Sequence, residues 1–277
     1  MTRAVLSVRD AQLTLGARTL WSALDLDVAP GEFVAVLGAN GSGKTSLLKA
    51  ILGQHPLAQG EIRLDGEPVR RGDRRIGYIP QQRGQDPALR IRGRDLVRLG
   101  VDGERWGTGL PSRARRERVD ELLEAVGASH YAKVPVAMLS GGEQQRLRVG
   151  QALAGDPRLM LCDEPLGSLD LRAQRLVSEL IDRHRRERGF GVLFVTHDVN
   201  PVLGMVDRVL YLAGGRFRIG TPDEVLTSEV LSELYQAEVD VIRTHGRVII
   251  VGTPDHAHHA HEHGHPHGHR GAHGGAA

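Results

Sequence analysis

Three short runs of apolar residues stand out in the pattern of hydrophobic and polar positions along the chain. They occupy residues 33–37, 159–162 and 192–195, are rich in strand formers and are too short for helices. Such runs predict fully buried strands of a parallel sheet. A polar segment follows each run directly, beginning at Gly38, Asp163 and Thr196. Because ligands bind beyond the carboxyl ends of strands in open α/β sheets, these segments predict one shared site.

Helical spacing and capping residues predict four helices. The first runs over about residues 43–52, with Gly53 positioned to end it. A second begins at Ser140, because Ser140 and Glu143 form the S-x-x-E pattern of a capping box. Two more are expected over about residues 112–126 and from Thr221, which a proline and acidic residues follow.

The remaining patterns predict what surrounds the parallel sheet. Partial alternation over residues 5–15 and 24–28 predicts a flanking antiparallel β-subdomain, and glycine-containing turns at 214–215 and 244–246 predict two hairpins. Residues from about 83 to 155 form an inserted helical subdomain in this interpretation, since most of the segment is polar, arginine-rich and broken by glycine and proline. The expected domain is α/β with a mainly parallel sheet and covers residues 1–252.

Composition narrows the classes of function. No stretch approaches the roughly 18 to 20 apolar residues that span a bilayer, and the N-terminus lacks the apolar core of a signal peptide, so a cytosolic chain is expected. The net charge of +2 gives no bulk electrostatic case for nucleic acid. The basic clusters at 113–118 and 183–188 are interpreted as solvated helix faces. A lone cysteine, Cys162, excludes an internal disulfide.

A phosphate-binding loop carries the clearest chemistry. Residues 38–45 match the pattern G-x-x-x-x-G-K-[ST] between a predicted strand and helix, where backbone N–H groups approach phosphate closely. Lys44 is expected to reach the β- and γ-phosphates of a nucleotide, and the Thr45 hydroxyl to ligate Mg²⁺. The predicted nucleotide-binding residues of the loop are Gly38, Asn40, Gly41, Ser42, Gly43, Lys44, Thr45 and Ser46.

Two adjacent acids follow the second apolar run. A strand would carry Asp163 from the core to the edge of a Mg²⁺ site, where it binds the metal directly or through water. Glu164 would then orient or polarise the water that attacks the γ-phosphate. The alternative is a pair of surface acids.

Residues 139–146 read LSGGEQQR, and chance would give the first five of these in fewer than about one such chain in a thousand. With the phosphate-binding loop and the acidic pair in this order, roughly residues 1–235 resemble ABC-type ATPases, which use ATP and Mg²⁺. The resemblance implies that Gln81 senses the γ-phosphate and the metal and lies near a transmembrane partner. The adjacent Gln82 is the alternative residue for this role. The resemblance also implies that His197 is the switch histidine.

The same resemblance implies a dimer. Ser140, Gly141 and Gly142 present a hydroxyl and backbone N–H groups at a helix N-terminus, an anion site without a lysine of its own. In the family this segment completes the ATP pocket of a second copy in a head-to-tail pair, and Asp170 of the segment 168–170 crosses the interface. Leu15 stands where the family usually has an aromatic residue against adenine, so weaker base recognition is expected.

Histidine dominates the C-terminal residues 253–277, whose composition predicts a disordered tail. Neutral imidazoles bind Zn²⁺, and a flexible chain could gather the three or four ligands of a zinc site. A functionless extension or an engineered tag is the alternative, although irregular spacing argues against a tag. The candidate ligands are His256, His258, His259, His261, His263, His265, His267 and His269, with His273 beyond them.

Residues 216–235 resemble the end of the ATPase subunits of zinc and manganese importers. With the tail, this favours the ATP-hydrolysing subunit of a transition-metal importer at the cytoplasmic face of the membrane. Its partners would be permease subunits and, through them, a substrate-binding protein. Import of another substrate such as an iron chelate, a soluble ABC ATPase of translation or DNA repair, and metal buffering by the tail are the alternatives.

Overall fold

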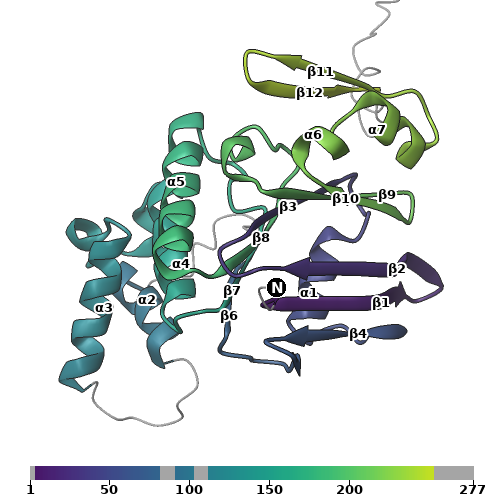
Figure 1. The fold of residues 1–277 in the computed structure, drawn as a ribbon. Coiled ribbons are helices and arrows are strands. Elements are labelled where there is room, and N and C mark those ends of the chain that lie inside the picture. The colour runs from purple at the N-terminus through teal and green to yellow at the C-terminus, as the bar shows by residue number, and fades with distance from the viewer. Residues whose placement is uncertain (1–3, 82–90, 103–111, 253–277) are drawn as a thin grey trace, which may run out of the picture.

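The computed structural model describes residues 4–81, 91–102 and 112–252. At its centre is a six-stranded sheet in the order β10-β9-β3-β8-β7-β6, in which all neighbours are parallel except β9 and β10 (Figure 1). The three apolar runs are β3, β7 and β8, as the sequence predicts. The strands are β3 (Phe33–Gly38), β6 (Ile76–Ile79), β7 (Leu159–Asp163), β8 (Gly191–Val195), β9 (Arg208–Ala213) and β10 (Arg216–Gly220).

A four-stranded antiparallel sheet lies beside the central one, which confirms the predicted β-subdomain (Figure 1). Its second strand begins well before the predicted residue 24. The ladder between β1 and β2 is irregular near Leu13, so Leu20 and Trp21 are both buried and the expected alternation fails there. The strands are β1 (Leu6–Leu15), β2 (Arg18–Val28), β4 (Gln59–Leu64) and β5 (Glu67–Pro68).

Helices α2, α3 and α4 lie together on one side of the central sheet, and α5 runs beside α4 (Figure 1). The predicted helix α3 and the predicted capping box of α4 are confirmed, whereas α2 was not predicted, since only Gly93, Leu96 and Val97 of its ten residues are buried. The helices are α1 (Lys44–Ile51), α2 (Gly93–Asp102), α3 (Arg113–Ala125), α4 (Gly141–Leu153) and α5 (Leu171–Arg188), with 3₁₀ turns at Ser129–Tyr131, Val136–Met138 and Leu203–Met205.

The C-terminal part of the described chain forms two short helices and a hairpin at one end of the molecule (Figure 1). Thr221 caps the first helix through a capping box, and the turn of the hairpin falls at His245 and Gly246, as predicted. No described helix is both long and apolar enough to cross a membrane. The elements are α6 (Pro222–Val225), α7 (Ser228–Tyr235), β11 (Asp240–Thr244) and β12 (Arg247–Val251).

Two hydrophobic clusters cover the two faces of the central sheet. Along β3, Phe33 and Ala35 belong to the cluster that includes α4 and α5, whereas Val34 and Val36 belong to the cluster that includes α1 and the antiparallel sheet. Alternate side chains of a strand point to opposite faces, so one strand contributes to both cores. The loop that follows β3 is therefore held by a strand buried on both sides.

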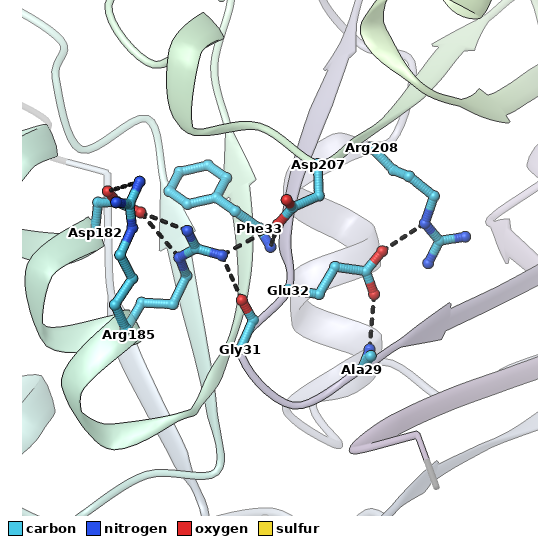
Figure 2. Close-up of polar contacts among 9 residues, drawn as sticks. Ala29, Gly31, Glu32, Phe33, Asp182, Arg185, Asp207 and Arg208 are labelled. Atoms are coloured by element: carbon cyan, nitrogen blue, oxygen red, sulfur yellow. Dashed lines mark hydrogen bonds and ion pairs between the residues drawn. The ribbon is translucent and has the colours of Figure 1, made fainter. Parts of the chain in front are cut away.

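The prediction that residues 183–188 form a solvated helix face was wrong for Arg185, whose side chain is only 8% exposed. It pairs with Asp182 and Asp207 and donates to the Gly31 carbonyl (Figure 2). Its guanidinium also lies 5.8 Å from the centre of the Phe33 ring. The final turns of α5 thereby join the start of β3 to the loop before β9, which periodicity in the sequence does not reveal.

Candidate nucleotide site

The phosphate-binding loop joins the end of β3 to the start of α1, and two of its glycines are required by geometry. A Cβ on Gly38 would lie 1.9 Å from the carbonyl oxygen of Leu212, and one on Gly43 would lie 2.9 Å from Nε1 of Trp21. Both residues have positive φ. The Lys44 ammonium lies 2.7 Å from the Gly38 carbonyl oxygen and 2.8 Å from that of Ala39. The loop thus places a cation and the N-terminus of α1 together, as a phosphate group needs.

Thr45 and Asp163 meet at the ends of α1 and β7. The Thr45 hydroxyl donates to Oδ1 of Asp163 at 2.9 Å, and the Tyr78 hydroxyl lies 3.5 Å from Oδ2. Burial raises the pKa of the Asp163 carboxyl, which is only 1% exposed. A hydroxyl beside a buried carboxylate is an oxygen donor set that suits Mg²⁺, and a divalent cation would favour the ionised carboxylate. These residues fit the predicted metal.

Glu164 and Gln81 also come into contact, from the position directly after β7 and from the segment after β6. Nε2 of Gln81 donates to Oε2 of Glu164 at 2.7 Å. Glu164 has a φ of 46°, a strained value for a residue with a Cβ, and its N–H donates to the carbonyl of Val195. His197 is exposed and stands two residues after Val195. The structure therefore brings three of the candidate residues to one edge of the sheet.

The segment after residue 138 begins α4 with a capping box. The Ser140 hydroxyl accepts from the Glu143 N–H, and the Glu143 carboxylate accepts from the Ser140 N–H at 2.9 Å. These hydrogen bonds to Ser140 lower the pKa of the Glu143 carboxyl. Asp170 caps α5 in the same way by accepting from the Ala173 N–H at 2.8 Å.

The N-termini of α4 and α5 lie against each other. A Cβ on Gly142 would lie 3.0 Å from that of Ala173, so glycine permits this approach. A cavity of about 520 Å³ opens here, and Ser140, Gly142 and Asp170 line it. Two helix N-termini beside a cavity supply partial positive charge to it, although the carboxylates of Glu143 and Asp170 also line it. The role of residues 140–142 stays a prediction.

A second, larger cavity of about 840 Å³ lies between the central sheet and the helical subdomain. Apolar residues such as Leu99 line it, together with Tyr78 and Pro80 of the segment that leads to Gln81. Arg148 of α4 also lines the cavity, and its Nε has no hydrogen-bond partner among the described residues. Burial lowers the pKa of this guanidinium, which remains positively charged.

Tyr78 was not predicted as a site residue, although its hydroxyl on β6 lies near Asp163. Its position three residues before Gln81 was the available signal. Leu15 is 41% exposed, and Trp21 is fully buried beneath the loop, as expected. The candidate zinc ligands from His256 onward lie outside the described residues, and Gln81 as a Mg²⁺ ligand stays a prediction.

Together, the parallel sheet, the phosphate-binding loop and the carboxylates at the end of β7 define a P-loop nucleotide-binding protein with the ABC ATPase fold. The sequence profile of the ABC transporter family matches residues 21–167. The chain belongs to the ABC transporter family.

Relatives of known name differ in cargo. The Fe(3+) ions import ATP-binding protein of Streptomyces avermitilis is 42% identical over 80% of this chain and 64% of its own length. The zinc import ATP-binding protein of Pseudomonas putida is 31% identical over 94% of this chain and 98% of its own length. Others at 36% and 37% identity are named for betaine, carnitine and choline transport in Bacillus subtilis and for aliphatic sulfonate import in Pseudomonas fluorescens.

A solved structure of an ABC transporter, described as of metal-chelate type and inward-facing, superposes with a TM-score of 0.75. It is 28% identical and the match covers 89% of this chain and 96% of that one. The predicted fold class is thereby confirmed. The chain spans 64% of the length of the iron-import relative, and nearly the whole of the zinc-import relative.

Proposed function

We propose that this chain is the ATP-hydrolysing subunit of an ABC importer and acts as a head-to-tail homodimer. The observation that carries the proposal is a pair of contacts, Thr45 with Asp163 and Gln81 with Glu164. They join the phosphate-binding loop, the segment after β6 and the end of β7, which are far apart in sequence. A structural ion-pair network would not need a glycine-lined loop and a buried lysine at the same place.

In this proposal the backbone N–H groups of the loop and Lys44 bind the phosphates of ATP, while Thr45 and Asp163 hold the metal. Bound Mg²⁺ would neutralise charge on the β- and γ-phosphates. Glu164 orients a water molecule and accepts its proton as the water oxygen attacks the γ-phosphorus and the bond to the bridging oxygen breaks. Gln81 fixes the Glu164 carboxylate through the contact at 2.7 Å.

The second copy supplies Ser140, Gly141 and Gly142 to the same nucleotide. Their helix N-terminus lies beside the cavity of about 520 Å³ and carries no lysine, so it suits the outer side of a γ-phosphate that Lys44 of the other copy already binds. ATP thus stabilises the dimer, and hydrolysis releases it.

The permease partner would dock in the cavity of about 840 Å³. Its lining mixes apolar residues such as Leu99 with charged ones, an arrangement that suits an amphipathic helix from a membrane protein, and Arg148 suits an acidic side chain on that helix. Tyr78 and Pro80 connect this lining to Gln81 and so to the site of hydrolysis. This arrangement places the chain at the cytoplasmic face of the membrane, with a substrate-binding protein on the other side of the permease.

The proposed cargo is zinc or manganese. The near-complete match to a zinc-import relative and the histidine run from His256 to His273 support it, whereas the more identical iron-import relative supports an iron chelate instead. The tail would bind Zn²⁺ through three or four imidazoles. Measuring the zinc, manganese and iron content of cells that lack the chain distinguishes these cargoes, and a loss confined to iron would overturn the zinc and manganese proposal.

Hydrolysis is tested with Glu164→Gln, which keeps the shape of the side chain and removes its basicity. We expect unchanged ATP affinity, a fall in turnover of at least about a hundredfold, and accumulation of an ATP-bound dimer on size exclusion. Glu124→Gln on the exposed face of α3 is the matched control and should behave as the wild type. Undiminished steady-state phosphate release by Glu164→Gln would contradict the proposed role.

A further inference from the structure

His197 is carried by a loop that is ordered by hydrogen bonds among its neighbours. The Thr196 hydroxyl donates to the carbonyl of Asp198 at 2.8 Å and accepts from the Asp198 N–H at 3.2 Å. Asp198 Oδ1 in turn accepts from the N–H of Asn200 at 2.9 Å and from its side-chain Nδ2 at 2.8 Å. Within the described ranges no hydrogen bond reaches the imidazole of His197 itself. Its position therefore depends on the backbone of this loop.

Asn200 connects that loop to the C-terminal hairpin, 48 residues away. Its Nδ2 donates to the carbonyl of Val248 at 2.9 Å, and its Oδ1 accepts from the Val248 N–H at 2.8 Å. The side-chain amide thus pairs with Val248 as a neighbouring strand would. Three hydrogen bonds occupy both amide hydrogens and the oxygen, so the orientation of the amide is fixed.

The hairpin has separate anchors on its other strand. The Val241 N–H donates to the Ser228 hydroxyl at 2.8 Å, and Arg243 pairs with Asp223 and donates to the carbonyl of Leu226. A two-stranded hairpin is marginal by itself, so these anchors set where β12 lies. The hairpin therefore bridges α6 and α7 on one side and the His197 loop on the other.

We propose that Asn200 is a positioning residue for His197, and that hairpin β11–β12 is thereby part of the hydrolytic machinery. The inference rests on the proposed function, because it assigns Asn200 an effect on ATP turnover through His197. The C-terminal hairpin can thereby affect ATP hydrolysis. A displacement of β12 moves Val248, and with it Asn200 and the backbone that carries His197. A solely structural hairpin would affect the unfolding temperature and leave the chemistry of folded chains unchanged.

The test compares Asn200→Ala, Asn200→Asp, His197→Ala and the double variant Asn200→Ala with His197→Ala, all in the full chain. Asn200→Asp is nearly isosteric and keeps an acceptor for Val248 but loses both Nδ2 donors, so it serves if the alanine variant folds poorly. Gln59→Ala is the matched control, since it removes a side-chain amide that donates to Asp10 in the antiparallel sheet, outside both the hairpin and the His197 loop. The measurements are kcat and KM for ATP hydrolysis, equilibrium ATP affinity and unfolding temperature.

We expect each Asn200 variant to lower kcat about tenfold with ATP affinity unchanged, and Gln59→Ala to lower it less than about twofold. Adding Asn200→Ala to His197→Ala should cause no further fall, because residues that act through one another are not additive. Unchanged kcat in folded Asn200 variants, or losses that add in the double variant, would overturn the inference alone. A wild-type chain without hydrolysis would overturn the proposed function and the inference with it.

Discussion

The Ser42 hydroxyl in the phosphate-binding loop is buried and, among the described residues, lacks a hydrogen-bond partner that the nucleotide could supply. The residue is 8% exposed, and within the described part of the chain its Oγ has no hydrogen-bond partner. A buried hydroxyl without a partner costs about 1 to 3 kcal/mol. Since the loop is built to surround phosphate, an oxygen of the nucleotide is the natural acceptor for this hydroxyl.

Ser42→Ala should therefore have opposite effects on stability and binding. We expect the free energy of unfolding without nucleotide to rise by about 1 kcal/mol and the affinity for MgATP to fall about tenfold. Chemical denaturation and equilibrium binding measure the two quantities. Ser178→Ala is the control, because this buried hydroxyl already donates to the Gln174 carbonyl at 2.8 Å and so should not gain stability. Equal ATP affinity in Ser42→Ala would show that the hydroxyl does not bind phosphate.

At this scale the sequence predicts residues whose chemistry stands in a short motif or at the end of an apolar run. Lys44, Thr45 and Asp163 are of this kind, and the structure brings the Thr45 hydroxyl against Asp163 and the Lys44 ammonium against the loop carbonyls. Tyr78 and Arg185 are not, because their functions depend on partners that a linear pattern does not show. Tyr78 lies 85 residues from Asp163 in sequence, and Arg185 looks like one of several surface arginines until its contacts are known.

Among the elements, α5 depends most on one buried charge. Arg185 pairs with Asp182 on its own helix and with Asp207 before β9, and its guanidinium faces Phe33 (Figure 2). Removing one partner from such a network leaves buried charge uncompensated and is strongly destabilising. The pairing thus links the helix to the start of the strand that carries the phosphate-binding loop.

We expect Arg185→Ala to lower the free energy of unfolding by about 3 kcal/mol. Arg175→Ala on the same helix is the matched control, because its side chain is 79% exposed and its ion pair with Glu179 at the surface is screened by solvent and contributes little to stability. Urea denaturation followed by circular dichroism measures both. Equal stabilities of the two variants would mean that the buried network contributes nothing beyond a surface ion pair.

Elements with local signals are predicted best. The start of α4 follows from its capping box, and the turns of both C-terminal hairpins follow from glycine. Helix α2 lacks such a signal, since few of its residues are buried, and the early start of β2 is hidden by the irregular ladder around Leu20. Packing in three dimensions, and not local preference, decides those two elements.

At the scale of the whole molecule, the fold places the phosphate-binding residues and the Ser140 helix N-terminus in two separate locations on one chain. Lys44 and Asp163 gather at the ends of β3 and β7, whereas Ser140 caps α4 beside a different cavity, which Asp170 also lines. The family resemblance predicts that the phosphate-binding loop and the Ser140 segment lie apart on one chain. It also predicts that the Ser140 segment of a second copy completes the site. The central claim is that one copy supplies the phosphate-binding loop and the other supplies Ser140, so that neither works alone.

Mixing two inactive variants tests that claim most directly. Lys44→Ala removes the phosphate-binding cation, and Ser140→Arg blocks the helix N-terminus, so each variant alone should lack ATP hydrolysis. In a mixed dimer, Lys44 of one chain and Ser140 of the other form one intact site, so an equal mixture should recover about a quarter of wild-type phosphate release. A mixture that stays as inactive as its components, although mixed dimers form, would contradict the account.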